Sequence, residues 1–185
     1  EVTGYIYMEG VAHLGEDERQ LVNTMATQVS SALQAINLQG DLHEANQLAL
    51  KMLAQASECM NEHISEHLQR VCTSTEQLAL FYGLDPSSAY KYGEAAILHD
   101  VGMVNIPTAI LQKPTSLEPH EFKQMQTHAL AGEQLLHSNR FLMLARDCAI
   151  SHHERWDGLG YPYGRKGEEI PLIGRLVAVM DVFDA

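Results

Sequence analysis

Apolar residues recur along the first third of the chain at alternating spacings of three and four positions. The first such series consists of Val22, Met25, Val29, Ala32 and Ile36. Gly40 interrupts the series, which resumes at Leu42 and runs to His63 with its phase shifted by one residue. The spacing is typical of a coiled-coil seam, and the interruption fits either two helices with a break or one long helix with a stagger. The seam either packs on its own domain or forms a parallel dimer helix that joins a sensor to an output domain.

From residue 57 onward the pattern predicts a chain of helices. Apolar positions at helical spacing, bounded by glycine and proline, define the runs. They cover 57–83, 86–101, 117–137, 141–153 and 171–184. Residues 2–8 are rich in β-branched and aromatic side chains and predict a single strand. The chain opens in this strand and stops inside an apolar pattern without a stop signal, so we expect a fragment of a longer protein, or the ordered part of one.

Composition narrows the classes of partner. The 185 residues carry a formal net charge of −12, which makes nucleic acid and anionic membranes unattractive partners. A phosphate substrate would then need local positive charge, which metal ions can supply. The three cysteines show no CxxC spacing and fit reduced thiols of a cytoplasmic protein. No apolar run is long enough to cross a bilayer, so we expect no membrane partner.

Histidine and aspartate stand where an unpaired polar group would be costly. His99 and Asp100 follow an apolar run that suggests a buried helix, and Asp181 lies inside another apolar run. His152 and His153 stand near the end of a predicted helix. Adjacent helical residues point about 100° apart, so each pair can approach one ion from two sides or straddle two ions. Spacing alone leaves metal ligands and hydrogen-bonded core residues as alternatives.

A run of turn-forming residues follows the second histidine pair directly. Residues 157–162 read Asp-Gly-Leu-Gly-Tyr-Pro, which cannot continue a helix and predicts a specific turn that carries one aromatic side chain. Metal ligands that lead straight into a rigid loop suggest a metal centre with a loop over its mouth.

Taken in order, the motifs of residues 57–185 resemble an HD-GYP domain, a branch of the HD-domain metal-dependent phosphohydrolases. The matching segments are His67–Val71, Ala95–Gly102, Ile106–Pro107, Ile110–Pro114, His128 with Gly132, His152–Pro162 and Asp181–Ala185. Residues 1–38 resemble, mainly by pattern, the last strand and closing helix of a GAF-like sensor domain. The resemblance implies an all-α HD-domain bundle over 57–185, preceded by a linker helix over 39–56 and by this strand remnant of a GAF-like α/β domain.

The same resemblance implies a two-metal centre. The first ion would be held by His67, His99, Asp100 and Asp181. The second would be held by Asp100, His128, His152 and His153, with Asp100 bridging. His63 is a further possible ligand, at a position where some relatives carry a glutamate associated with a third ion. Iron or manganese suits this set of imidazoles and carboxylates better than a thiolate-type zinc site does.

The implied reaction is hydrolysis of cyclic di-GMP to linear pGpG or to GMP by a hydroxide held between the two metals. His99 and Asp100 are the implied catalytic residues. The implied substrate-binding residues are Asp157, Gly158, Gly160, Tyr161 and Pro162. Further expected partners are diguanylate cyclase (GGDEF) domains and a second copy of the chain, bound through the N-terminal helix.

Met103 departs from the family pattern, because members that hydrolyse the substrate usually carry lysine after His-Asp-x-Gly. Methionine has no charge with which to hold a phosphate. A second hypothesis is therefore a non-catalytic HD-GYP module that binds cyclic di-GMP or a diguanylate cyclase partner. A third is hydrolysis of another phosphoester, such as a nucleotide or a different cyclic dinucleotide. The remaining histidines read as ordinary surface residues: His13, His43, His120 and His137.

Overall fold

The computed structural model describes residues 15–57, 64–137 and 142–184. Within these ranges every regular element is a helix, which confirms the all-α expectation. The chain divides into two compact units, Glu1–Leu48 and Ala49–Ala185. The predicted strand over 2–8 lies outside the described residues, as does His63, and the GAF-like assignment stays a prediction. None of the described helices combines the length and apolarity needed to span a bilayer.

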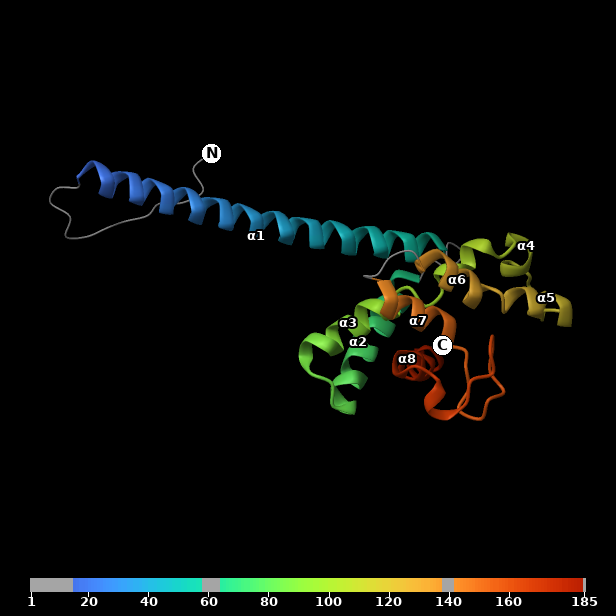
Figure 1. Ribbon diagram of the computed structural model, residues 1–185. Helices are drawn as coiled ribbons and strands as arrows, with labels where there is room; N and C mark the ends of the chain where they lie inside the picture. Colours follow the sequence, from blue (N-terminus) through green and yellow to red (C-terminus); the bar gives the residue numbers. More distant parts are fainter. Residues whose placement is uncertain (1–14, 58–63, 138–141, 185) are drawn as a thin grey trace. The chain divides into compact units, whose positions relative to one another are not determined.

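Helix α1, Glu16–Ser57, is a single helix of 42 residues (Figure 1). Three acidic residues occupy its first turn, where they complement the positive end of the helix dipole. Gly40 does not break it, so of the two alternatives the structure contains one long helix. Seam residues Met25, Val29 and Ile36 remain 56%, 47% and 64% exposed in the single chain. Ala54, in the last part of α1, belongs to the second unit and is fully buried in its core.

The second unit is a bundle whose core collects side chains from α2, α3, α7 and α8. Its longer helices are α2 (Ile64–Tyr82), α3 (Pro86–Ala96), α6 (His128–Leu136), α7 (Met143–Ser151) and α8 (Leu172–Asp184). Shorter elements connect them: η1 (Val101–Asn105), α4 (Thr108–Leu111), α5 (Pro119–Met125) and η3 (Gly167–Glu169). Leu98, Val101 and Ile173 are among the most deeply buried side chains of this core. Helix α2 packs on α3 and α8, while α6 packs on η1 and α7.

Two predicted helical runs are interrupted, and both interruptions fall at candidate ligands. The run over 86–101 ends early, because α3 stops at Ala96 and the next residues form tight turns. His99 N donates to Ala96 O at 3.1 Å, a three-residue spacing. His99 and Asp100 therefore lie on a turn, and their predicted placement on a helix is wrong. The turn brings Gly102 against α6, where an added Cβ would lie 1.9 Å from His128 O.

The run predicted over 117–137 is two helices, α5 and α6, separated at Gln126 and Thr127. Thr127 Oγ1 donates to Gln124 O at 2.7 Å, so a side chain competes there with the helical backbone pattern. No glycine or proline marks this break, which is why periodicity alone missed it. The break places His128 at the start of α6, where its side chain is buried.

Candidate metal centre

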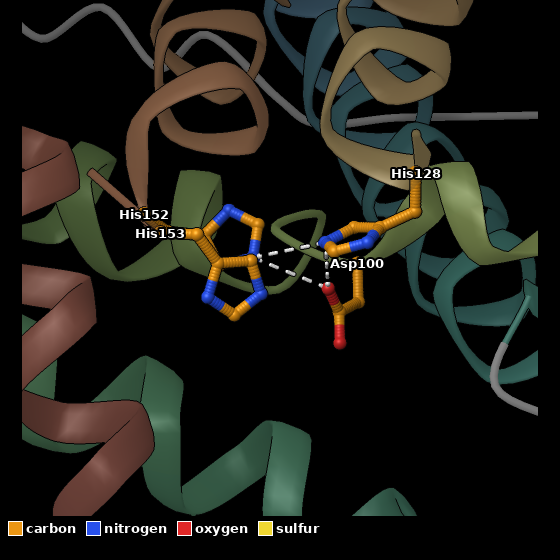
Figure 2. Close-up of side chains that lie close together, drawn as sticks. All are labelled: Asp100, His128, His152 and His153. Carbon is orange, nitrogen blue, oxygen red and sulfur yellow. Dashed lines mark hydrogen bonds and ion pairs between the residues drawn. The ribbon is translucent and has the colours of Figure 1, made fainter. Parts of the chain in front are cut away.

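Seven side chains that can ligate metal lie in two neighbouring groups. The first group is His67, His99 and Asp181, and the second is Asp100, His128, His152 and His153. Figure 2 shows the second group, which is built from the turn before η1, the start of α6 and the end of α7. Within each group the candidate ligand atoms all lie within 4.8 Å of one another. The fold thus gathers every described residue that the sequence singled out as a metal ligand.

Asp100 lies between the two groups. Its Oδ1 is 3.2 Å from the Nε2 atoms of both His128 and His152. Its Oδ2 is 3.6 Å from His99 Nε2, in the first group. Oδ1 is buried and has no hydrogen-bond partner. A carboxylate with one oxygen toward each group has the arrangement that bridging of two ions requires.

Three of the rings are anchored in the same way, through Nδ1. His99 Nδ1 contacts Ala96 O at 2.9 Å. His128 Nδ1 contacts Met125 O at 2.7 Å, and His152 Nδ1 contacts Ala149 O at 3.0 Å. A carbonyl oxygen only accepts, so each Nδ1 carries the proton. In the neutral ring, Nε2 then keeps its lone pair.

These lone pairs converge on one another. The Nε2 atoms of His128 and His152 are 3.4 Å apart, and both face Asp100 Oδ1. Neutral imidazoles and a carboxylate aimed at one point repel one another unless a cation lies between them. Mixed nitrogen and oxygen donors suit a first-row transition metal. The residues present therefore fit a bound metal ion.

At Asp100, His152 and His153 the shifts in pKa favour the protonation states that bind metal. Burial acts to raise the pKa of Asp100, but the surrounding imidazoles outweigh it and hold that pKa well below its usual value. Burial lowers the pKa of His152 although Asp100 opposes the shift. Burial, reinforced by the charge of His152, lowers the pKa of His153 to about 2. An ionised carboxylate and neutral imidazoles are the forms in which these groups ligate.

The loop after the second histidine pair is fixed by a buried carboxylate. Glu154 is 4% exposed and accepts from the backbone N of Tyr163 at 2.8 Å and of Arg165 at 2.9 Å. Gly160 lies so close to the start of the loop that a Cβ there would be 2.3 Å from Arg155 N. Glu154 therefore ties the far side of the loop to the end of α7. Sequence reasoning missed this role, although Glu154 stands next to the predicted ligands.

The predicted substrate-binding residues divide into two kinds. The Tyr161 ring lies against His153, with centroids 4.7 Å apart and planes 31° apart, and so borders the second group. Asp157 instead serves the loop itself, because its carboxylate pairs with Arg155 at 2.5 Å and accepts from Leu159 N at 2.9 Å. Gly158 adopts φ 80°, a conformation that favours glycine.

Two further residues support the first group and were not predicted. His67 Nδ1 lies 2.6 Å from Asp184 Oδ2. Arg70 donates to Asp184 Oδ1 from Nε at 2.5 Å. This hydrogen bond lowers the pKa of Asp184 below its usual value against the opposing effect of burial, and His67 adds to the lowering. Both residues stand inside matching motifs, but only the packing of α2 on α8 shows that they meet.

Comparison with known proteins matches the part of the chain that carries the two groups of ligands. The sequence profile described as "HD domain" matches residues 51–185. The chain belongs to the HD-domain family. All seven candidate ligands lie within this HD domain.

Curated phosphodiesterases are also similar to this chain. The chain is 38% identical over 186 residues to "3'3'-cGAMP-specific phosphodiesterase 2" of Vibrio cholerae, covering 100% of this chain and 36% of that protein. It is 40% identical over 138 residues to "Cyclic di-GMP phosphodiesterase" of Thermotoga maritima, covering 74% and 38%. It is 40% identical over 147 residues to "Cyclic di-GMP phosphodiesterase response regulator RpfG" of Xanthomonas campestris pv. campestris, covering 78% and 39%. The chain thus spans little more than a third of the length of these relatives.

Proposed function

We propose that the HD domain is a metal-dependent phosphodiesterase of the HD-GYP branch that hydrolyses cyclic di-GMP to linear pGpG or to GMP. The observation that carries the proposal is the placement of Asp100, with one oxygen toward each of two groups of ligand atoms. Relatives named as cyclic di-GMP phosphodiesterases support the choice of substrate. We infer two ions, iron or manganese, from the mixed imidazole and carboxylate donors.

The chemistry divides between the ions and the chain. When bound, two divalent ions would stabilise charge on the phosphoryl oxygens and lower the pKa of a water. The chain fixes the directions of the ligands, because the Nδ1 anchors leave each Nε2 with one orientation. His99 and Asp100 would be the catalytic pair, since they face each other across the boundary between the groups. Tyr161, at the edge of the second group, offers a ring on which a guanine could stack.

The direct test is turnover by purified protein loaded anaerobically with Fe²⁺ or Mn²⁺. We expect linear product from cyclic di-GMP, and loss of product in His99→Ala and Asp100→Asn. His120→Ala is the matched control, because His120 is an exposed histidine outside both groups and should keep wild-type activity. Elemental analysis should find about two transition-metal ions per chain. Wild-type protein that is no more active than His99→Ala would overturn the proposal.

A second candidate substrate is 3'3'-cGAMP. The observation that favours it is the match to the cGAMP-specific relative of Vibrio cholerae, which extends over 100% of this chain. Parallel measurement of kcat/KM for the two cyclic dinucleotides separates the candidates. Preference for 3'3'-cGAMP would retain the metal centre of the proposal and replace its substrate.

The alternative function is a non-catalytic module that binds cyclic di-GMP or a diguanylate cyclase domain. Met103 motivates it, because this η1 residue is half-buried and carries no charge for a phosphate. Met103→Lys tests whether a missing phosphate contact limits turnover. A large gain in kcat would support this alternative, and an unchanged kcat would remove its main reason.

We further propose a parallel homodimer through α1. Its support is the exposed seam of Met25, Val29 and Ile36 at coiled-coil spacing. Sedimentation equilibrium should give a dimer for the wild-type protein and a monomer for Val29→Asp. Ser31→Asp, at an exposed position on the outer side of the predicted seam, should remain dimeric. Equal masses for the two variants would contradict the predicted seam.

A further inference from the structure

Arg70 and Asp184 join α2 to α8 beside the first group of ligands, His67, His99 and Asp181. Each stands three positions after a ligand on its own helix, Arg70 after His67 and Asp184 after Asp181. Residues at this spacing share a helix face. Asp184 therefore faces both His67 and Arg70, with His67 Nδ1 2.6 Å from Oδ2 and two Arg70 nitrogens at 2.5 and 3.0 Å. Its side chain is only 12% exposed.

The anchor of His67 differs from that of the other three rings. His99, His128 and His152 each contact the backbone carbonyl three residues earlier, which belongs to the same local turn as the ring. The orientation of each of these rings is therefore set locally. The partner of His67 is a carboxylate on another helix, 117 positions away in the sequence.

His67 depends more on its hydrogen-bond partner than the other three rings do, because its side chain is less buried. The His67 side chain is 23% exposed, whereas those of His99, His128 and His152 are 0–1% exposed. Packing holds the three buried rings, but it encloses His67 less completely. A charged acceptor makes a shorter and stronger hydrogen bond than a neutral carbonyl. A carboxylate on the far nitrogen also fixes the tautomer and raises the basicity of a ligating ring.

We propose that Asp184, held in place by Arg70, is a positioning residue that sets the metal affinity of the first group, and that the second group does not depend on it. This inference rests on the proposed two-metal function. Asp184 orients His67 so that its Nε2 faces Asp181 Oδ1, 3.7 Å away, and these two atoms would help to hold the first ion. In the second group His128 and His152 have local backbone anchors, so this group should keep its affinity without Asp184.

The test is a titration of metal-free protein with Mn²⁺, in which the electron paramagnetic resonance signal of free Mn²⁺ reports the bound number and each Kd. Wild-type protein should bind two ions and show the spectrum of a coupled pair when loaded. Asp184→Asn keeps the side-chain volume but removes the charge. One Kd should rise roughly 10–100-fold, the usual effect of losing such a supporting contact. The other Kd should stay at its wild-type value, and one equivalent of Mn²⁺ should give the spectrum of an isolated ion.

Asp147→Asn is the matched control, because Asp147 on α7 also pairs with an arginine, Arg146, and belongs to neither group. It should bind two ions as the wild-type protein does. Arg70→Gln keeps the carboxylate but loosens it, so it should weaken the same site by a smaller factor. If circular dichroism shows that Asp184→Asn does not fold, the Mn²⁺ titration of Arg70→Gln tests the proposal instead.

Two outcomes overturn the inference. Either the variants bind two ions with wild-type affinities, or both sites weaken equally, as a general loosening of the bundle would cause. A wild-type protein that binds no Mn²⁺ would instead overturn the proposed function and this inference with it. The wild-type titration therefore distinguishes the two failures.

Discussion

Gly102 is the position at which a single methyl group should separate the two halves of the second ligand group. In Gly102→Ala the new Cβ would lie 1.9 Å from His128 O and 2.5 Å from Gly132 N. Both are backbone atoms, so no side-chain rotation relieves the overlap. Reaching even 3.0 Å requires η1 and α6 to move apart by about 1 Å. Overpacking of this kind typically costs about 1–3 kcal/mol of unfolding free energy.

The displacement acts directly on the ligands. Asp100 stands just before η1 and His128 begins α6, and their ligand atoms are now 3.2 Å apart. A shift of about 1 Å in a catalytic geometry can cost roughly 10²-fold in rate. We therefore expect Gly102→Ala to lose an Mn²⁺ equivalent by titration and to lower kcat/KM by about that factor.

Gly93→Ala is the matched control for this prediction. Its Cβ would lie 2.8 Å from Cys72 O, between α3 and α2, away from the second group. It should lower the urea midpoint while the second group keeps its ion. If Gly102→Ala has wild-type stability and metal stoichiometry, the reasoning about the contact between η1 and α6 is refuted.

Three further predictions concern the loop after α7, the stability of the protein at acid pH and helix α1. Glu154→Gln replaces one of two acceptor oxygens by a donor, so it should lower the free energy of unfolding by about 1–3 kcal/mol. It should also speed amide hydrogen exchange at Tyr163 and Arg165, and unchanged exchange would refute the role of Glu154 in holding the loop. Burial lowers the pKa of His153 to about 2, below the unfolded value near 6.5, so the unfolded state takes up the proton as pH falls. As the pH falls from about 7.5 to about 5.5, the free energy of unfolding of the metal-free protein should therefore decrease by about 1.4 kcal/mol through His153. Urea titrations of His153→Gln should show a free energy of unfolding that depends less on pH. An identical pH dependence in the variant and the wild-type protein would contradict the shift in the pKa of His153. Gly40→Ala, where no atom lies within 4 Å of the new Cβ, should raise helicity and stabilise α1 by about 1 kcal/mol, and reduced ellipticity would argue for a break there.

The sequence predicted the helices better than their ends. Helix α8 follows its predicted run almost residue for residue, because glycine, proline and apolar spacing define it locally. The run through His99 failed at Ala96, because the turn there is required by the approach of Gly102 to α6. The prediction of one helix over 117–137 failed at Thr127, where the side-chain hydrogen bond to Gln124 O competes with the helical backbone pattern and no glycine or proline marks the break.

By itself, the sequence determined the class of the fold, most of the helices and the set of candidate ligands. The fold class follows from local periodicity, and the cost of burying histidine and aspartate without partners pointed to His99, Asp100 and Asp181. The full set of ligands, His67 and His128 included, is what the resemblance to HD-GYP domains implies. The resemblance implied two groups of ligands with Asp100 between them, and the tertiary structure supplied the distances at which these side chains meet. The tertiary structure alone showed that Asp184 supports the first group and that Glu154 holds the loop. Apart from the loop contacts of Glu154, those facts depend on elements that meet across 24 to 117 positions of sequence. No local pattern records which oxygen of a carboxylate faces which ring, because that is set only when the helices pack.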